Sequence, residues 1–340
     1  MTKMTGKVNV RTRVRNALIG IAYGDSFGMP VEMWNPKTIQ EKVGTVTTLL
    51  SGHPDNPISR DLCRGSVTDD TMNSLIVTDV LYQNHGRVDA GMFIRELKHW
   101  MDTSENSAAV VGPSTRRAIE LIDQGVSMEV SGSRGTTNGG AMKIIPVGLV
   151  NGLAGIVNKE KLIRDVVELL KPTHFTSGAI SAACAIAGGA AIAVTGETSV
   201  EAVFRFMTEM AELGSAYGMQ WGGPSVAARM KLGRYFIEQY AEEKALDSIY
   251  RIIGTSVSSE ESVPAAAALL LLADGDPKKC AELCANIGGD TDTMAAMAVG
   301  ICGAMSEDEN LFHFRDIDLI EKVNGLNFDQ WTGKIMACMQ

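Results

Sequence analysis

The run from Gly178 to Val194 constrains the fold of this chain more than any other segment, because Ser181 is its only conventional polar residue. The run is rich in Ala and Gly and falls short of the roughly 20 strongly apolar residues that a membrane-spanning helix needs. His174 lies just before it. We therefore expect a helix buried at the centre of a soluble, cytoplasmic protein that does not associate with a membrane.

Helical periodicity dominates the rest of the chain. Between Val200 and Leu213, apolar residues recur at positions i, i+3, i+4 and i+7, with polar residues off that face. Similar patterns surround Leu18 and Leu162. Strand-like alternation is scarce, and its best example, Val43 to Leu49, is short and rich in Thr. The sequence predicts a mostly α-helical fold.

The chain shows neither a flexible linker nor a repeat of fixed period, so we expect residues 1–340 to form a single helical domain. Irregular segments rich in Gly, Pro and polar residues are where a helical scaffold places its binding groups. The segments of this kind are Pro30 to Leu62, Ser104 to Pro113, Ser131 to Gly140 and Leu213 to Pro224.

Composition excludes several classes of protein. With 45% hydrophobic and 21% charged residues, the chain is neither fibrous nor natively unfolded. Its net charge of -9 repels phosphate backbones, so we expect no nucleic-acid backbone binding. The six cysteines include no C-x-x-C pair, which fits a reducing compartment. Cys280 and Cys284 are better explained as buried small hydrophobic residues than as half of a metal site.

Two clusters of Thr and Asp stand directly before apolar-rich helical stretches. They are Thr68-Asp69-Asp70-Thr71 and Gly288-Gly289-Asp290-Thr291-Asp292-Thr293. One Asp would suffice to cap each helix, yet each cluster concentrates two carboxylates and two hydroxyls, whose repulsion a cation would relieve. Oxygen ligands select Mg²⁺, or Mn²⁺ or Ca²⁺, over zinc. Either cluster alone could be a cap or a metal site. Together they could hold two ions about 3.5–4 Å apart and activate a water.

Two glycine-rich segments supply further candidate groups. Gly20 to Glu32 is expected to be a helix end passing into a turn that delivers the Glu32 carboxylate, the alternative being a glycine-terminated helix with a surface Glu. It is not a dinucleotide fingerprint, because the glycine spacing is wrong and no strand precedes it. Gly132 to Lys143 could bring backbone N–H groups close to a phosphate or ribose, although it lacks the ending of a P-loop.

Five motifs, in this order, resemble the ADP-ribosylglycohydrolase family over about residues 10–305. They are Gly-Asp-x-x-Gly with a following Glu (Gly24 to Glu32), Thr-Asp-Asp-Thr (68–71), Asn-Gly-Gly-Ala-Met (138–142), Thr173-His174 and Gly-Gly-Asp-Thr-Asp-Thr (288–293). Members of that family include the dinitrogenase-reductase-activating glycohydrolase, the hydrolases that free arginine or serine from ADP-ribose, and certain lens crystallins.

The resemblance implies a compact, all-α orthogonal bundle with a two-Mg²⁺ centre at the bottom of a cleft, with Mn²⁺ as a substitute ion. The implied metal ligands are Thr68, Asp69, Asp70, Asp290, Asp292 and Thr293. Glu32 matches the position of a mobile acid that exchanges protons with the water or leaving group, and Asp292 is the second candidate for that role.

The substrate side of the cleft, facing the diphosphate and adenosine, is expected to include Gly135, Asn138, Gly139, Gly140, Met142 and His174. For His174, a buried histidine bonded to the backbone is the alternative. The implied activity is hydrolysis of the N- or O-glycosidic bond that joins ADP-ribose to a protein side chain or small acceptor. A metal-associated water would attack the anomeric carbon of the distal ribose.

One departure and two alternatives bear on this implied activity. Nitrogenase-regulating members carry an acid where Pro113 stands in the run Val111 to Arg117, which argues against an arginine-directed mechanism. A hydrolase of small ribosides or nucleosides is the first alternative, because chelation of ribose hydroxyls requires no diphosphate. The second is a non-catalytic ADP-ribose-binding or structural member, which should have lost metal carboxylates, whereas all four are present.

Overall fold

The structure is a computed structural model that describes residues 8–103 and 112–339. Within these ranges the chain forms α-helices, two 3₁₀ turns and one π-helical turn, without a β-strand, which confirms the predicted all-α fold. Val43 to Leu49, the best example of strand-like alternation, forms no strand. The backbone N–H and C=O of Val46 bond to the side chain of Asn286 at 2.9 and 2.8 Å, so this segment is satisfied by a helix side chain instead of a ladder.

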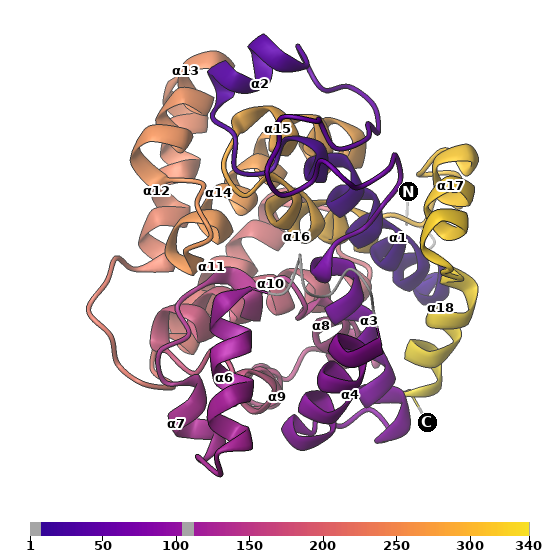
Figure 1. Cartoon of the computed structure of the whole chain (residues 1–340), viewed down its shortest axis with the longest axis vertical. Coiled ribbons are helices and arrows are strands. Elements are labelled where there is room, and N and C mark those ends of the chain that lie inside the picture. Colours follow the sequence, from indigo (N-terminus) through magenta and orange to yellow (C-terminus); the bar gives the residue numbers. More distant parts are fainter. Residues whose placement is uncertain (1–7, 104–111, 340) are drawn as a thin grey trace, which may run out of the picture.

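The elements follow one another along the chain as shown in Figure 1. Their bounds are α1 Val10–Gly28, η1 Met29–Val31, α2 Pro36–Lys42, α3 Asp69–Gln83, α4 Ala90–Thr103, α6 Pro113–Asp123, α7 Met128–Gly132, η2 Asn138–Gly140, α8 Ile145–Gly152, α9 Lys159–Leu170, α10 Ser177–Val194, α11 Val200–Gly214, α12 Val226–Gln239, α13 Glu242–Ser248, η3 Ile249–Ile253, α14 Ser259–Leu272, α15 Pro277–Ile287, α16 Thr291–Ala304, α17 Phe314–Asn324 and α18 Phe328–Ala337.

Helix α10 lies at the centre of the helix assembly and packs against α8, α9, α11, α14 and α16 (Figure 1). Among the described helices it alone is long and apolar enough to cross a membrane, and 89% of it is buried inside the protein. Gly188 and Gly189 let the side chains of Met210 and Met207 on α11 approach the α10 backbone. The expectation of a buried central helix is therefore confirmed.

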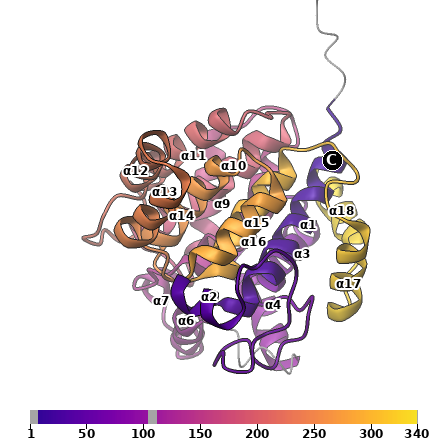
Figure 2. The ribbon, with the colours of Figure 1, turned by 90° about the horizontal axis from the view of Figure 1, so that it is seen from above.

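Helices α1 and α16 form the most extensive helix pair in the described part of the chain, and they lie side by side in Figure 2. Gly20, Gly24 and Gly28 face α16, where an added Cβ would overlap its backbone. The segment is a helix end that passes into a turn delivering Glu32, as predicted. The turn is not glycine-rich, because α1 stays helical through Gly28 and the η1 turn consists of Met29, Pro30 and Val31. The glycines serve close helix packing, which brings Glu32 beside the start of α16.

Gly24→Ala is expected to lower the free energy of unfolding by about 3 kcal/mol, because the new methyl group would overlap the carbonyl of Ala295 in a backbone that cannot yield cheaply. Gly333→Ala in α18 is the matched control, since nothing lies within 4 Å of its added Cβ. That helical Gly→Ala change should stabilise the protein by up to about 1 kcal/mol. Urea denaturation measures both, and equal stabilities of the two variants would contradict the packing role.

The predicted irregular segments are partly helical. Pro30 to Leu62 contains α2, which begins with Pro36. The Asn35 side chain caps this helix by accepting a hydrogen bond from Thr38 N at 2.9 Å. Of the irregular segment predicted at Ser104 to Pro113, residues 104–111 lie outside the described part of the chain. Its last residue, Pro113, begins α6. Buried apolar side chains from α1 through α18 form one continuous cluster, with Cys280 and Cys284 both buried in it, as predicted.

Candidate active site

The N-terminus of α3 is held by a buried carboxylate from α1. Asp25 accepts hydrogen bonds from the backbone N–H groups of Thr68 and Thr71, at 2.9 and 3.1 Å, and from the Thr71 hydroxyl at 2.5 Å. Burial raises the pKa of Asp25 to about 6, against the lowering effect of these hydrogen bonds. Because Asp25 satisfies part of the helix start, the carboxylates of Asp69 and Asp70 are available for another purpose.

Asp25 is a site residue that the sequence reasoning missed. Its partners Thr68 and Thr71 lie far away in sequence, so no local spacing identifies it. A signal was present in the Gly-Asp-x-x-Gly motif, where Asp25 is an acid between Gly24 and Gly28, but no role was assigned to it.

The N-terminus of α16 is built by a tight turn and two backbone contacts. Gly288 and Gly289 have φ of 83° and 85°, a conformation that favours glycine. The N–H of Asp290 donates to Thr255 O at 2.7 Å, and Gly289 N donates to Trp34 O at 2.8 Å. Asp290 occupies the N-cap position, yet its side chain makes no capping hydrogen bond. Its carboxylate instead accepts from the side chain of Asn138, outside its own helix.

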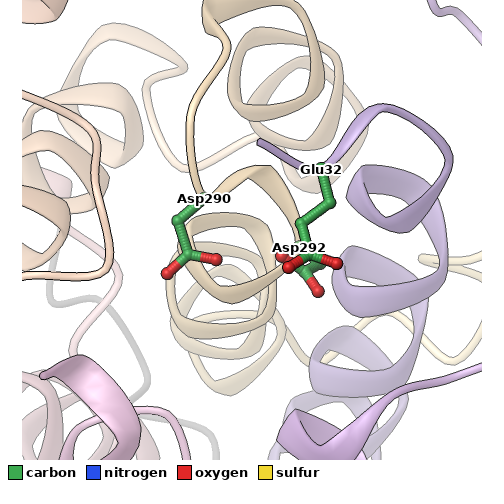
Figure 3. A group of neighbouring side chains, drawn as sticks. All are labelled: Glu32, Asp290 and Asp292. Atoms are coloured by element: carbon green, nitrogen blue, oxygen red, sulfur yellow. The ribbon is translucent and has the colours of Figure 1, made fainter. Parts of the chain in front are cut away.

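The two helix starts and the Glu32 turn bring carboxylates together. Glu32, Asp290 and Asp292 each offer an oxygen within 4.8 Å of the others, and Figure 3 shows the three side chains meeting in the same space. The Thr293 hydroxyl donates to Asp70 at 3.3 Å, which joins α16 to α3. The Oδ1 atoms of Asp70 and Asp292 are buried without a hydrogen-bond partner. Unpartnered buried carboxylate oxygens fit a cation with oxygen ligands.

Crowding changes the protonation of these carboxylates. Burial, then repulsion by Asp290 and Asp69, raises the pKa of Glu32 to about 8. Burial, then repulsion by Asp25 and Asp290, raises the pKa of Asp69 to about 7. The pKa values of Asp70, Asp290 and Asp292 are raised by burial as well. Without a cation the folded cluster holds protons that a dication would displace.

The free energy of unfolding of the metal-free protein is expected to fall as pH rises from about 4 to about 8. Glu32 and Asp69 keep protons in the folded state up to pKa values of about 8 and about 7, whereas their ordinary values are 4.5 and 3.8. The folded state thus binds more protons than the unfolded chain in this window, so rising pH destabilises it. Mg²⁺ at 100 to 1,000 times its Kd should restore about 3–4 kcal/mol.

Thermal unfolding with EDTA or with Mg²⁺, at about pH 5.5 and about pH 8, measures this linkage. The gain in Tm from Mg²⁺ should be larger at the higher pH, and Na⁺ at matched ionic strength should not reproduce it. A gain from Mg²⁺ that is equal at both pH values would contradict the assignment of these carboxylates to a cation.

A cleft of about 380 Å³ opens over this cluster. All the predicted metal ligands line it, together with Glu32. The further lining residues are Met33, Ile58, Leu62, Gly112, Ser114, Thr115, Thr137, Asn138, Gly139, Met142, His174 and Val257.

Four of the six residues predicted on the substrate side, Asn138, Gly139, Met142 and His174, line the cleft. The other two, Gly135 and Gly140, are not among the lining residues and pack behind it. An added Cβ at Gly135 would overlap Thr173 O, and one at Gly140 would crowd Leu170. Whether the four lining residues contact a substrate stays a prediction.

His174 lines the cleft although it is fully buried. Its Nε2 pairs with the Thr137 hydroxyl at 2.9 Å and its Nδ1 with the Thr173 hydroxyl at 2.8 Å. Burial, then the charge of Lys143, holds the pKa of His174 well below its usual range, so the ring is neutral. The alternative of a histidine bonded to the backbone does not describe it, because both ring nitrogens meet hydroxyl groups.

Lys143 is a second residue whose place the sequence reasoning missed. Its side chain is almost fully buried, donates to Gly139 O, and lies with Nζ 5.2 Å from the centre of the Phe93 ring. Burial lowers the pKa of Lys143 to about 7, and the charges of Asp69 and Asp70 oppose that shift. It is a buried amine within electrostatic reach of Asp69 and Asp70.

Asn138 contacts the carboxylate cluster as well as lining the cleft. Its backbone N–H donates to Val257 O at 2.8 Å, and its side-chain amide donates to Asp290 Oδ2 and to Ser262 Oγ. The amide thus orients a predicted metal ligand.

Asn138→Ala is expected to weaken Mg²⁺ binding by about 10–100-fold, because Asp290 loses the donor that fixes its carboxylate. Titration calorimetry measures the affinity, and Met142→Leu, a volume-conserving change in the same cleft, should leave it nearly unchanged. Equal Mg²⁺ affinity in Asn138→Ala and the native protein would contradict the positioning role.

Comparison with known proteins agrees with this geometry. A family model described as ADP-ribosylglycohydrolase matches residues 7–313. The chain is 32% identical over 322 residues to the uncharacterized protein YegU of Escherichia coli (strain K12), covering 94% of this chain and 95% of YegU. An uncharacterized protein of Archaeoglobus fulgidus is 29% identical over 300 residues, or 86% of each chain.

A solved structure described as an ADP-ribosylglycohydrolase-related protein complex shares the fold, with a TM-score of 0.68 at 20% identity. The match covers 97% of this chain and 98% of that one. The chain therefore belongs to the ADP-ribosylglycohydrolase family, whose members hydrolyse glycosidic bonds.

Proposed function

We propose that this protein is a Mg²⁺-dependent cytoplasmic hydrolase of the N- or O-glycosidic bond between ADP-ribose and a protein side chain or small acceptor. The observation that carries the proposal is the convergence of Glu32 with the Asp-rich starts of α3 and α16 on one cleft, where two buried carboxylate oxygens lack partners. A structural cap requires neither the additional acids nor the opening above them.

The residues that would hold the ions are Thr68, Asp69, Asp70, Asp290, Asp292 and Thr293, which supply only oxygen ligands. This donor set favours Mg²⁺, with Mn²⁺ as a substitute. When bound, the ions supply positive charge for ribose hydroxyls and make a nearby water more acidic.

Glu32 is positioned to move a proton. Its backbone N–H donates to Met29 O at 3.3 Å, and its carbonyl accepts from the Asn56 side chain at 2.9 Å. These two hydrogen bonds hold the backbone of Glu32 in place. Its carboxyl group holds a proton at neutral pH in the metal-free protein, because burial and the surrounding acids raise its pKa to about 8. In the reaction, the protonated form of Glu32 donates a proton to the leaving atom as the bond to the anomeric carbon breaks, and the charged form accepts one from the attacking water. Bound cations lower its pKa from the metal-free value.

A hydrolase of small ribosides or nucleosides is the second candidate, and the charge of the cleft favours it. No Lys or Arg occurs among the described residues that line the cleft. A diphosphate would have to rely on backbone N–H groups and on hydroxyls such as those of Ser114, Thr115 and Thr137. A riboside without phosphate needs no such partners.

A substrate panel separates the two candidates. It contains arginine-, serine- and small-molecule-linked ADP-ribose together with nucleosides, each with Mg²⁺, with Mn²⁺ or with EDTA. We expect release of ADP-ribose that requires Mg²⁺, is partly restored by Mn²⁺ and disappears with EDTA. Hydrolysis of nucleosides alone would support the second candidate. A protein that binds Mg²⁺ by calorimetry and hydrolyses no substrate in the panel would overturn both.

A further inference from the structure

Besides the buried Met142, four apolar side chains line the cleft: Met33, Ile58, Leu62 and Val257, together called the apolar rim. Met33, Ile58 and Val257 remain 46%, 38% and 42% exposed, although large apolar side chains usually avoid water. Exposed apolar side chains gathered around one opening mark a surface that binds an apolar group.

The backbone at Met33 is strained, and the strain places an apolar side chain at the opening. Met33 has a φ of 63°, in the left-handed region that disfavours side chains larger than glycine, at a cost of about 1–2 kcal/mol. Its N–H donates to Gly289 O at 2.7 Å, so the turn that ends at Glu32 is tied to the loop before Asp290. Met33 keeps this strained backbone next to the proposed catalytic acid Glu32, although its side chain is not needed for the core. We take this as a sign that the Met33 side chain binds part of the substrate.

Ile58 is fixed to the same turn. The Asn56 side chain donates to Glu32 O at 2.9 Å and accepts from Ile58 N at 2.9 Å, and Ser59 Oγ donates to Pro30 O at 3.3 Å. Part of the apolar rim and the proton-transferring acid thus form one connected unit. A leaving group that takes a proton from Glu32 would lie against these side chains.

The apolar rim itself offers a localised cation such as a guanidinium no charged partner. Among the described lining residues of the cleft, the carboxylates other than Glu32 are the four predicted metal ligands. A guanidinium packed against Met33 and Ile58 would lose its hydration shell. Because no further carboxylate is available there to pair with it, this desolvation would be costly. The flat face of a neutral heterocycle would instead gain from contact with methionine and isoleucine side chains.

We infer that the leaving group accepted at the apolar rim is a flat nitrogen heterocycle, of the nucleobase or pyridine type, joined to ribose through a ring nitrogen. This inference rests on the proposed hydrolysis of ribosyl bonds and narrows its leaving group to a small heterocycle in place of a protein side chain. The bond from C1′ to the ring nitrogen breaks, its electron pair stays on nitrogen, and the water oxygen bonds to C1′. When the leaving group is a neutral base, its nitrogen also takes the proton of Glu32, and the attacking water then gives a proton back to Glu32. When it is a pyridinium, the nitrogen takes only the electron pair, and the proton of the attacking water goes to solvent.

Three substrates that share the ADP-ribosyl group test the preference: NAD⁺, ADP-ribosyl-arginine and a peptide carrying ADP-ribosyl-serine. Inosine and uridine extend the series to ribosides without a diphosphate. We expect kcat/KM to be at least tenfold higher for a heterocyclic substrate than for ADP-ribosyl-arginine. Met33→Gly, which suits the positive φ, and Ile58→Ser should each reduce that ratio at least fivefold, mainly through KM. Ile156→Ser, at an apolar residue that is 81% exposed and outside the cleft, is the control.

Binding of free leaving groups keeps the test independent of hydrolysis. By calorimetry in the presence of Mg²⁺, nicotinamide or hypoxanthine should bind at least tenfold more tightly than methylguanidine, and Met33→Gly should remove most of the difference. Equal binding, or a preference for methylguanidine, would overturn the inference even in an active enzyme. Preferential binding of the heterocycles to a protein without any hydrolase activity would support the rim assignment and reject the proposed function.

Discussion

Asp292→Asn is expected to lower kcat by at least about 10³-fold and to remove measurable Mg²⁺ binding. Asp292 lies in the first turn of α16 with Oδ1 buried and unpartnered, beside the carboxylates of Glu32 and Asp290. The amide keeps the volume of the side chain but places a donor or a neutral oxygen where a negative ligand is needed. Release of ADP-ribose measures kcat, and calorimetry measures Mg²⁺ binding.

The same substitution should raise the stability of the metal-free protein at about pH 8. Repulsion by Glu32, Asp290 and Asp70 adds to burial in raising the pKa of Asp292, so the neutral amide removes an unfavourable charge. Lost activity combined with increased metal-free stability is the signature of a ligand rather than of damage to the fold. Glu309→Gln, at an exposed acid outside the cleft, is the control. Normal Mg²⁺ affinity in Asp292→Asn would contradict its assignment as a ligand.

Local patterns predicted the helix starts of this site because the signal lies within a few adjacent residues. Thr68 and Asp290 occupy N-cap positions, as the Thr- and Asp-rich clusters indicated. That the two starts meet was inferred from the chemistry of four carboxylates around shared cations and from the family resemblance, since no local rule brings residues so distant in sequence together. The hydrogen bond from Thr293 to Asp70 is the contact that joins them.

The errors share a physical cause, which is that tertiary packing decided what local propensity left open. Gly24 and Gly28 were expected to belong to a turn, because glycine often ends a helix, but they serve the contact with α16. Val43 to Leu49, where the alternation was most strand-like, forms no strand, since Asn286 satisfies the backbone of Val46. The role of Asp25 was missed because its carboxylate accepts hydrogen bonds from the first residues of α3, which are distant from it in sequence.

Glu32→Gln is expected to lower kcat by about 10²–10⁴-fold, while Mg²⁺ binding and ADP-ribose affinity change by no more than a few-fold. The amide keeps the size and most hydrogen bonds of the side chain but cannot exchange a proton. Asp69→Asn should differ from it by weakening Mg²⁺ and ligand binding together. Single-turnover rates, with calorimetry of Mg²⁺ and of ADP-ribose, measure the three quantities.

The pH profile gives a second test of Glu32. A general acid must be protonated to act, so kcat/KM should fall as pH rises through its pKa, which burial and the neighbouring acids raise to about 8 in the metal-free protein. Bound cations favour the charged form of Glu32, so in the Mg²⁺-loaded enzyme this decline should begin below pH 8. Glu32→Gln should lose the decline. Near-normal kcat at saturating substrate would make Glu32 a structural or gating residue, and proton transfer would pass to Asp292, whose oxygens share the same space.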